Sequence, residues 1–306
     1  MKIGSSTNVR KKSNKKDLAM SIAFLLPAIL ICVVFIIYPV IDTFDLSFRK
    51  WNGMFGAPRE WIGLENYTKI LSDKMFWNAM LNSVYFMIGG FVVLMPLAFG
   101  LALLVTSKIK GTSFFRTCYF LPNMLGITAV ALMWTFILNP NFGIFNAIEN
   151  IFGITLNVPD VLTVKTLNVW IVVLVNEWTY AGYNMLIFAA GLVAIPEELN
   201  EAAALDGATG WQRIRYITLP LMKNSIKVFS ILCITGCLKV FDIIWAMTRG
   251  GPNDISSTPT IMLYTQGFSY KLFGRSSAYG VILLVLGVVL SVVTNHIFRE
   301  DKDLAM

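Results

Sequence analysis

Charged side chains are scarce in this sequence. Only 14% of its 306 residues are Asp, Glu, Lys or Arg, whereas a soluble domain carries about 25%. The composition is 56% hydrophobic, and the apolar residues collect in long runs without a helical or strand period. A membrane-spanning helix needs about 20 apolar residues to cross a hydrocarbon core of roughly 30 Å. Several runs reach that length, so the composition argues against a soluble core and predicts an integral membrane protein.

Residues that carry catalysis or bind metals are equally scarce. The single histidine, His296, lies at the end of the last apolar run. The cysteines form no CxxC pair and are expected as small buried hydrophobes within the apolar runs: Cys32, Cys118, Cys233 and Cys237. No zinc site or catalytic triad can be assembled from these residues, and no Walker A sequence occurs. We therefore predict no metal site, no catalytic residue and no enzyme activity in this chain.

Six apolar runs are long enough to span a bilayer. They cover about 18–41, 79–106, 117–139, 166–194, 225–247 and 278–298. The first run follows a lysine-rich segment and resembles a signal peptide, but it exceeds the usual 7–15 apolar residues, and no small-residue cleavage site follows it. We expect an uncleaved first helix and an all-α fold of six transmembrane helices.

The net charge of +7 follows the edges of the apolar runs and forms no aromatic-interleaved patch, so we expect no nucleic-acid partner. With the N-terminus inside, the cytoplasmic segments are shorter and hold more Lys and Arg than the outer ones, which predicts two cytoplasmic termini. The expected organisation is a basic cytoplasmic tail (1–17), a first helix (18–41), an extracytoplasmic segment (42–78), a five-helix core (79–298) and a cytoplasmic tail (299–306).

The predicted cytoplasmic loop 195–222 has the pattern of a helix–turn–helix. Pro196 suits the first turn of a helix, and acidic residues follow it near the positive end of the helix dipole. Strong helix formers lead to Gly207, which can end the helix with a positive φ. A second short helix is expected over Trp211–Ile217, ending at Pro220.

This loop resembles the coupling signature of binding-protein-dependent ABC importer permeases. The matching residues are Glu201, Ala202, Ala203, Asp206, Gly207, Ile217, Leu219 and Pro220. The resemblance implies a type I ABC importer permease fold in a bacterial inner membrane, with the loop docked into an ATPase subunit that binds ATP and Mg. It also implies a second permease subunit, two ATPase subunits and an extracytoplasmic solute-binding protein as partners.

Other segments resemble the carbohydrate-importing, maltose-type branch of that family. They are Trp61-Ile62-Gly63-Leu64-Glu65-Asn66-Tyr67, Phe114-Phe115-Arg116 with Leu121-Pro122, and Met247-Thr248-Arg249-Gly250-Gly251-Pro252. This resemblance implies a di- or oligosaccharide as substrate, without indicating which one. Gly250-Gly251-Pro252 is also a turn signal where a helix must stop.

Polar residues within the apolar runs are candidates for a substrate pathway, because ionisable groups at membrane depth are costly and usually face protein or water. Glu177, Tyr180 and Asn184 are spaced by three and four residues, so they share one helical face. Lys239 and Asp242 are three residues apart. Both groups also have structural interpretations: an internal Lys239–Asp242 ion pair, and a Glu177 that hydrogen-bonds between helices or lies near the outer interface.

Two other functions fit a polytopic membrane protein. An ion-coupled secondary transporter of a polar solute would favour internal pseudo-repeats and would need no ATPase-docking loop. An intramembrane enzyme would need paired catalytic groups at depth, and the Lys239/Asp242 pair does not resemble one. The coupling loop favours the ATP-driven importer over both.

Overall fold

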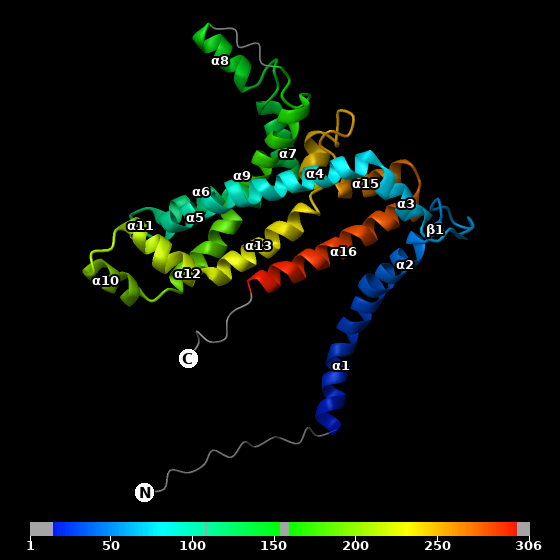
Figure 1. Cartoon of the computed structure of the whole chain (residues 1–306), viewed down its shortest axis with the longest axis horizontal. Helices are drawn as coiled ribbons and strands as arrows, with labels where there is room; N and C mark the ends of the chain where they lie inside the picture. The colour runs from blue at the N-terminus through cyan, green and yellow to red at the C-terminus, as the bar shows by residue number, and fades with distance from the viewer. Residues whose placement is uncertain (1–14, 108, 154–158, 299–306) are drawn as a thin grey trace.

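The computed structural model of the chain describes residues 15–107, 109–153 and 159–298. Within these ranges the chain is almost entirely helical (Figure 1). Most of the predicted tail 1–17 and all of the predicted tail 299–306 lie outside the described residues.

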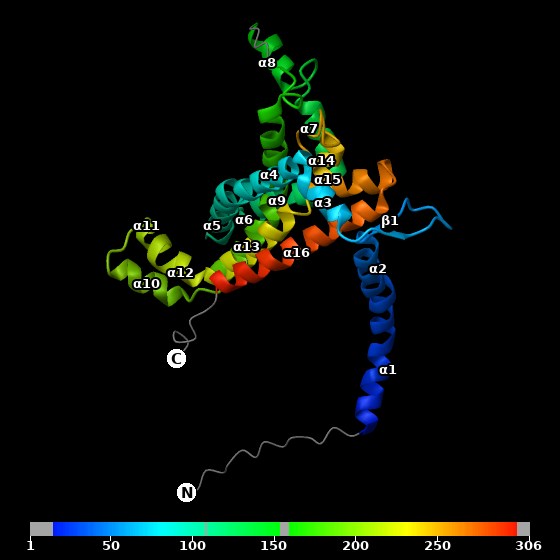
Figure 2. The same ribbon diagram turned by 45° about the vertical axis from the view of Figure 1, so that its right-hand side comes forward.

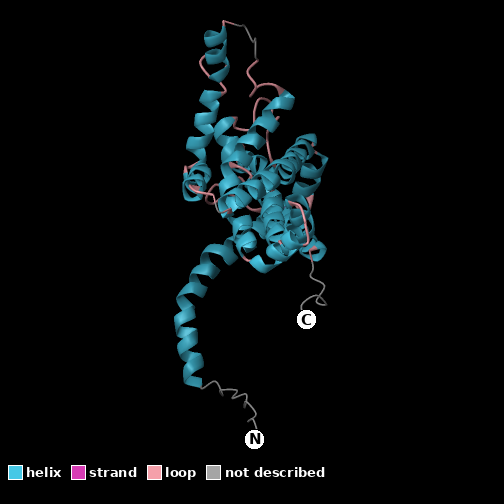
Figure 3. Ribbon diagram, turned by 90° about the vertical axis from the view of Figure 1, so that its left-hand side faces the viewer, coloured by secondary structure: helices cyan, strands magenta, loops and turns pink. Residues whose placement is uncertain are grey.

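The first membrane helix projects away from the rest of the molecule. It is built from α1 (Lys15–Cys32), η1 (Val33–Ile37) and α2 (Tyr38–Ser47), and it extends beyond the expected 18–41. None of its most apolar stretch is buried, and Figure 3 shows it standing apart from the helical bundle. Its apolar side chains therefore find few neighbours within the described chain.

A short non-helical segment follows this helix. Strands β1 (Arg49–Lys50) and β2 (Glu60–Trp61) pair antiparallel, with Arg49 opposite Trp61. Helix α3 (Glu65–Ser72) then packs beside them, where the buried Asn66 Nδ2 donates to the carbonyls of Ser47 (2.9 Å) and Arg49 (3.0 Å). The expected all-α fold therefore has one small two-stranded exception.

Three long helices form the body of the bundle. The first comprises α4 (Lys74–Gly89), η2 (Gly90–Leu94) and α5 (Met95–Thr106); the others are α9 (Lys165–Val193) and α16 (Phe273–Ile297). Helix α5 packs along α9, and their shared core contains Ala98, Met185 and Phe188. These helices agree with the predicted spans 79–106, 166–194 and 278–298, although two of them begin several residues earlier.

Two expected spans are broken. Run 117–139 forms α6 (Thr112–Met124) and α7 (Ile127–Ile137), which meet at 94°. Run 225–247 forms α13 (Lys223–Cys237) and α14 (Asp242–Met247), with a non-helical segment between them. A hydrophobic run reports the environment of its residues but not the direction of the backbone, so the two bends do not follow from the runs themselves.

The described residues contain three helices that are long and apolar enough to cross a membrane: Ile22–Ser47, Lys74–Thr106 and Phe273–Ile297. The number rises to six if each of three strongly bent helix pairs counts as one span. The bent pairs are Thr112–Met124 with Ile127–Ile137, Leu167–Val193 with Glu197–Leu205, and Gly210–Leu221 with Lys223–Cys237.

Wide π-type turns precede three of the prolines. Each turn ends two residues before the proline: η1 before Pro39, η2 before Pro96 and η3 (Ile214–Thr218) before Pro220. A helical proline lacks an N–H and its ring clashes with the carbonyl four residues earlier. In all three cases that carbonyl belongs to the wide turn, whose i→i+5 bonding leaves room for the ring. A fourth such turn, η4 (Thr265–Ser269), has no proline after it.

The segments between the long helices contain two further short helices. Helix α8 (Ile144–Phe152) projects from the bundle, whereas α15 (Pro259–Tyr264) packs against α4 and α16 (Figure 2). Before α15 the chain makes a turn in which Arg249, Gly250, Asn253 and Asp254 have positive φ. The turn expected at Gly250-Gly251-Pro252 is thus confirmed.

Candidate functional site

The loop predicted to couple to an ATPase begins with α10 (Glu197–Leu205), and Pro196 occupies the position just before its first residue. Gly207 follows with φ +77°, a left-handed conformation that suits glycine. The Ala208 N–H donates to the Ala203 carbonyl (2.9 Å) and the Gly207 N–H to the Ala204 carbonyl (3.2 Å). These two bonds define a Schellman motif, so the expected role of Gly207 as the helix terminator is confirmed.

The second helix of the loop starts one residue after its cap, Thr209. The Gln212 N–H donates to Thr209 Oγ1 (3.4 Å), and the Thr209 N–H donates to Gln212 Oε1 (2.7 Å), which completes a capping box. The helix runs through α11 (Gly210–Arg213), η3 and α12 (Leu219–Leu221). The helix ends at Leu221, one residue beyond the expected end at Pro220, and the wide turn η3 accommodates the proline ring in its last turn.

The loop lies at a corner of the molecule (Figures 1 and 2) and carries large apolar side chains that are exposed. Leu205, Trp211 and Tyr216 are 90%, 69% and 71% exposed. Of the residues that match the coupling signature, Ala203 is buried, Ile217 and Leu219 are half-buried, and the rest are exposed: Glu201, Ala202, Asp206, Gly207 and Pro220. We refer to Leu205, Trp211 and Tyr216 as the docking patch.

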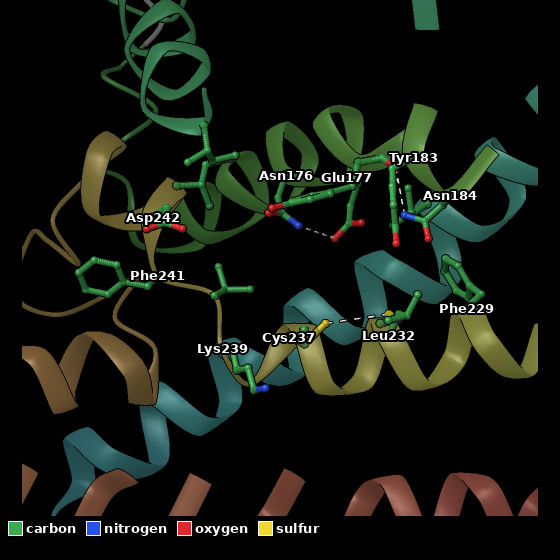
Figure 4. A pocket seen from close by; sticks show the side chains of 17 residues that line it. Asn176, Glu177, Tyr183, Asn184, Phe229, Leu232, Cys237, Lys239, Phe241 and Asp242 are labelled. Atoms are coloured by element: carbon green, nitrogen blue, oxygen red, sulfur yellow. Dashed lines mark hydrogen bonds between the residues drawn. The ribbon is translucent and has the colours of Figure 1, made fainter. Parts of the chain in front are cut away.

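All five predicted pathway residues line a single cavity of about 350 Å³, shown in Figure 4. They are Glu177, Tyr180 and Asn184 from α9, with Lys239 and Asp242 from the segment around the break between α13 and α14. Residues far apart in sequence are thus brought to one site. Direct contact of these residues with a substrate remains a prediction.

The α9 wall of the cavity is polar and well shielded. Glu177 is 2% exposed and Asn184 is 6% exposed, whereas Tyr180 is 39% exposed. Asn176 Nδ2 donates to Glu177 Oε1 at 3.4 Å, and Asn184 Nδ2 donates to the Tyr180 carbonyl at 3.0 Å. Both bonds lie within one helix, so among the described residues no bond ties Glu177 to a neighbouring helix. Sequence reasoning missed Asn176, although an amide inside an apolar run was a usable signal.

The Lys239–Asp242 ion pair, the structural alternative to a pathway role for these residues, is not formed. Neither side chain takes part in an ion pair within the described residues. Helix α13 ends at Cys237 and α14 begins at Asp242, so a spacing of three residues no longer places two side chains on one helical face.

The break itself is held by two threonines. Thr258 Oγ1 donates to the Val240 carbonyl (2.7 Å), and Thr260 Oγ1 donates to the Leu238 carbonyl (3.0 Å). These bonds satisfy carbonyls that a continuous helix would have paired internally, as non-helical backbone at membrane depth requires.

No three His, Cys, Asp or Glu side chains come together at a possible metal site in the part of the chain that the structure describes. Cys233 and Cys237, which line the cavity, have sulfur atoms 4.0 Å apart and are free thiols. The cavity therefore offers hydroxyl, amide, carboxylate and ammonium groups beside apolar and aromatic surface, which suits reversible binding of a polar solute.

The sequence and the fold of this chain match those of known proteins. The family model described as "Binding-protein-dependent transport system inner membrane component" matches residues 95–300. A probable ABC transporter permease protein of Pyrococcus horikoshii is 31% identical over 274 residues, which cover 89% of this chain and 93% of that protein. The trehalose/maltose transport system permease protein of Thermococcus litoralis is 29% identical over 296 residues, which cover 97% of this chain and 99% of that protein.

A solved structure has nearly the same fold over almost the whole chain. It is a bacterial ABC transporter involved in the import of the acidic polysaccharide alginate, with a TM-score of 0.82 and 26% identity over 94% of this chain and 97% of that one. The family match spans well over half of the sequence and includes loop 195–222 and all but one of the residues that line the cavity. The chain therefore belongs to the family of inner-membrane components of binding-protein-dependent transport systems.

Proposed function

We propose that the chain is one permease subunit of an ATP-driven importer for a di- or oligosaccharide. A second permease subunit, two ATPase subunits and an extracytoplasmic solute-binding protein complete the complex. The observation that carries the proposal is the rigid helix pair 197–221, which is capped at Gly207 and Thr209 and carries the exposed docking patch. A pair fixed in this way can transmit a push from a moving partner to α9 and α13, the helices on either side.

Energy comes from the partner, because the sequence contains no Walker A motif. ATP and Mg bind to the ATPase subunits. Their closure moves the docked loop, and the loop moves the two helices that form opposite walls of the cavity. The solute is thereby exposed first to the outer side and then to the cytoplasm.

The arrangement of the described helices supports placing both termini on the cytoplasmic side. The end of α2 and the start of α16 lie in contact near the β1–β2 hairpin. From there, one chain segment leads away from the hairpin to the start of α1, and the other to the end of α16. The end of α16 lies at the same side as α12, so it shares a face with loop 195–222 (Figure 2).

The cavity supports a saccharide as the cargo. Hydroxyl groups need directional donors and acceptors, which Asn176, Glu177 and Asn184 supply, while sugar C–H faces pack on rings such as Tyr180 and Tyr183. The likeness to a trehalose/maltose permease supports the same cargo class.

Replacing Trp211 by alanine should remove most of the ATPase subunit that co-purifies with the tagged chain. The indole is 69% exposed on the loop, so its loss should spare the fold and weaken only docking. The amount of ATPase subunit retained with the tagged chain should therefore fall about tenfold or more. Phe55→Ala, which truncates an exposed ring on the opposite hairpin, is the matched control. Full retention by the Trp211 variant contradicts the docking role.

If the wild-type chain retains no ATPase and uptake follows the proton gradient, an ion-coupled secondary transporter is favoured instead.

Alanine substitution at Glu177, Tyr180 or Asn184 should lower saccharide uptake while the complex still assembles, because each side chain lines the cavity. Uptake into proteoliposomes and recovery of the complex on an affinity column separate the two effects. Leu174→Ala changes a half-exposed residue of the same helix outside the cavity and should have little effect. Normal uptake by all three variants would show that the cavity is not the pathway.

A further inference from the structure

Four aromatic rings form a row beside the cavity. Phe241 and Trp245 are four residues apart at the start of α14, and Tyr264 and Phe268 are four residues apart where α15 continues into η4. This spacing places two side chains on one helical face. The ring centroids of Phe241 and Trp245 are 5.6 Å apart, and those of Trp245 and Tyr264 are 4.8 Å apart. The Tyr264 and Phe268 centroids are 5.0 Å apart. We refer to these four rings as the aromatic row.

The inner end of the aromatic row belongs to the cavity. Phe241 lines the cavity together with Glu177 and Tyr180, and Figure 4 shows its ring at the edge of the site, near Asp242. From there the row continues to α15, which lies at the end of the bundle away from α10 and α12 (Figure 2). The row therefore connects the cavity with the side of the molecule opposite the coupling loop.

Beyond the row, further rings are covered by their own packing. Phe268 contacts Phe273, and Phe273 contacts Trp51, each with centroids 5.6 Å apart. The Arg59 guanidinium lies 4.7 Å from the centre of the Trp51 ring, and a Cβ on Gly53 would stand 2.3 Å from Phe273 Cε2. These contacts hold the β1–β2 hairpin on the bundle, so Trp51 and Phe273 have a structural role.

The rings of the aromatic row are more accessible. Phe268 is 54% exposed, and the other three rings are half-buried. Within the described residues, neither the Trp245 indole N–H nor the Tyr264 hydroxyl makes a hydrogen bond. Tyr and Trp rings that only fill a core usually have these polar atoms paired. The row thus offers apolar ring surface beside two hydrogen-bonding groups that a solute can reach.

We propose that the aromatic row is a second saccharide site, in which a sugar ring binds at Trp245 and Tyr264 next to the cavity. The proposal rests on the proposed transport function and adds a site to it. The face of an aromatic ring is negative and attracts the weakly positive C–H groups of a sugar ring, while the N–H and O–H pair with sugar hydroxyls. A protein partner also binds exposed rings, but the continuity of the row with the cavity through Phe241 favours the solute.

Fluorine NMR of the tagged chain labelled with 5-fluorotryptophan tests the proposal. The chain is purified with any subunits that accompany it, and without a binding protein. The resonance missing from Trp245→Phe identifies Trp245, and this change keeps an aromatic ring. The resonance missing from Trp170→Phe identifies the matched control, a 38% exposed ring of α9 outside the cavity lining. The probes are maltotriose, cellotriose and mannotriose, which differ in sugar or linkage and presuppose no particular cargo. Sorbitol supplies hydroxyl groups without a ring.

We expect at least one trisaccharide to shift the Trp245 resonance saturably, while the Trp170 resonance stays in place and sorbitol has no effect. Tyr264→Leu should lower the apparent affinity about fivefold, because it removes one ring contact and the hydroxyl. Tyr180→Ala should leave the Trp245 shift intact, because Tyr180 lies in the cavity and outside the row.

Three results would overturn the proposal. One is a Trp245 resonance that none of the trisaccharides shifts. Another is a shift that disappears in Tyr180→Ala, since it would report occupancy of the cavity alone. The third is a loss of accompanying subunits from Tyr264→Leu, which would identify the row as a protein contact. The transport function is judged separately, by the ATPase that the wild-type chain retains, so either inference can fail without the other.

Discussion

Replacing Gly207 with valine should abolish transport while leaving the chain inserted and assembled in the membrane. Gly207 has φ +77°, and a β-branched residue is strongly disfavoured there. An added Cβ would meet nothing within 4 Å, so the strain is purely one of backbone conformation. Relief of that strain would undo the Schellman hydrogen bonds and loosen the angle between α10 and α11, at about 1–3 kcal/mol. The loop would then yield when the ATPase moves.

The measurement is saccharide uptake together with ATPase activity of the purified complex. Hydrolysis that continues without uptake is the expected pattern for a loosened coupling element. Gly207→Asn is predicted to keep partial transport, because asparagine tolerates the left-handed region. Gly210→Ala is the matched control, since Gly210 has open space around it and lies in a helical turn. Wild-type transport by the valine variant would refute the proposed geometry.

Replacing Gly182 with alanine should prevent most of the protein from folding. Gly182 lies where α9 packs against α6, and a Cβ there would stand 2.1 Å from the Tyr119 carbonyl oxygen and 2.7 Å from the Phe120 Cα. Both neighbours are backbone atoms, so no side chain can move aside. Small residues permit such close helix contacts in membranes, and overpacking by one methyl typically costs about 1–3 kcal/mol. The cost here falls at the upper end of that range or above it.

Yield of monodisperse protein in detergent and its thermal unfolding midpoint report this effect. Gly100→Ala is the matched control: it adds the same methyl group to a glycine in α5, with nothing within 4 Å. A Gly182→Ala variant with the yield and midpoint of the Gly100 variant would show that α6 and α9 are not in backbone contact at this point.

Local sequence determines most of the coupling loop, and that part could be predicted. Pro196, the alanine-rich helix and Gly207 act through backbone conformation and capping, which depend on residues within a few positions. The polar face of α9 could also be predicted, because Glu177, Tyr180 and Asn184 follow helical spacing along an unbroken helix.

The features that could not be predicted depend on contacts between distant segments. The alternative of a Lys239–Asp242 ion pair assumed a continuous helix, but the break is stabilised by Thr258 and Thr260, which lie about twenty residues further along the chain. The 94° bend near Gly126 follows no strong local signal beyond that glycine. The wide turn that places Pro220 inside the last turn of its helix is not revealed by composition either.

The wide turn η2 has a consequence for sequence comparison. Its i→i+5 hydrogen bonds enclose one residue more than α-helical bonds, and each residue advances an α-helix by about 100°. Counted as one uninterrupted helix, the buried positions of α4, such as Ala79 and Phe86, and those of α5, such as Ala98 and Ala102, would lie on different sides. When one residue fewer is counted between the two helices, these buried positions fall on the same side. A relative that keeps these helix contacts without the wide turn would therefore align with this chain only across a one-residue gap within 90–94.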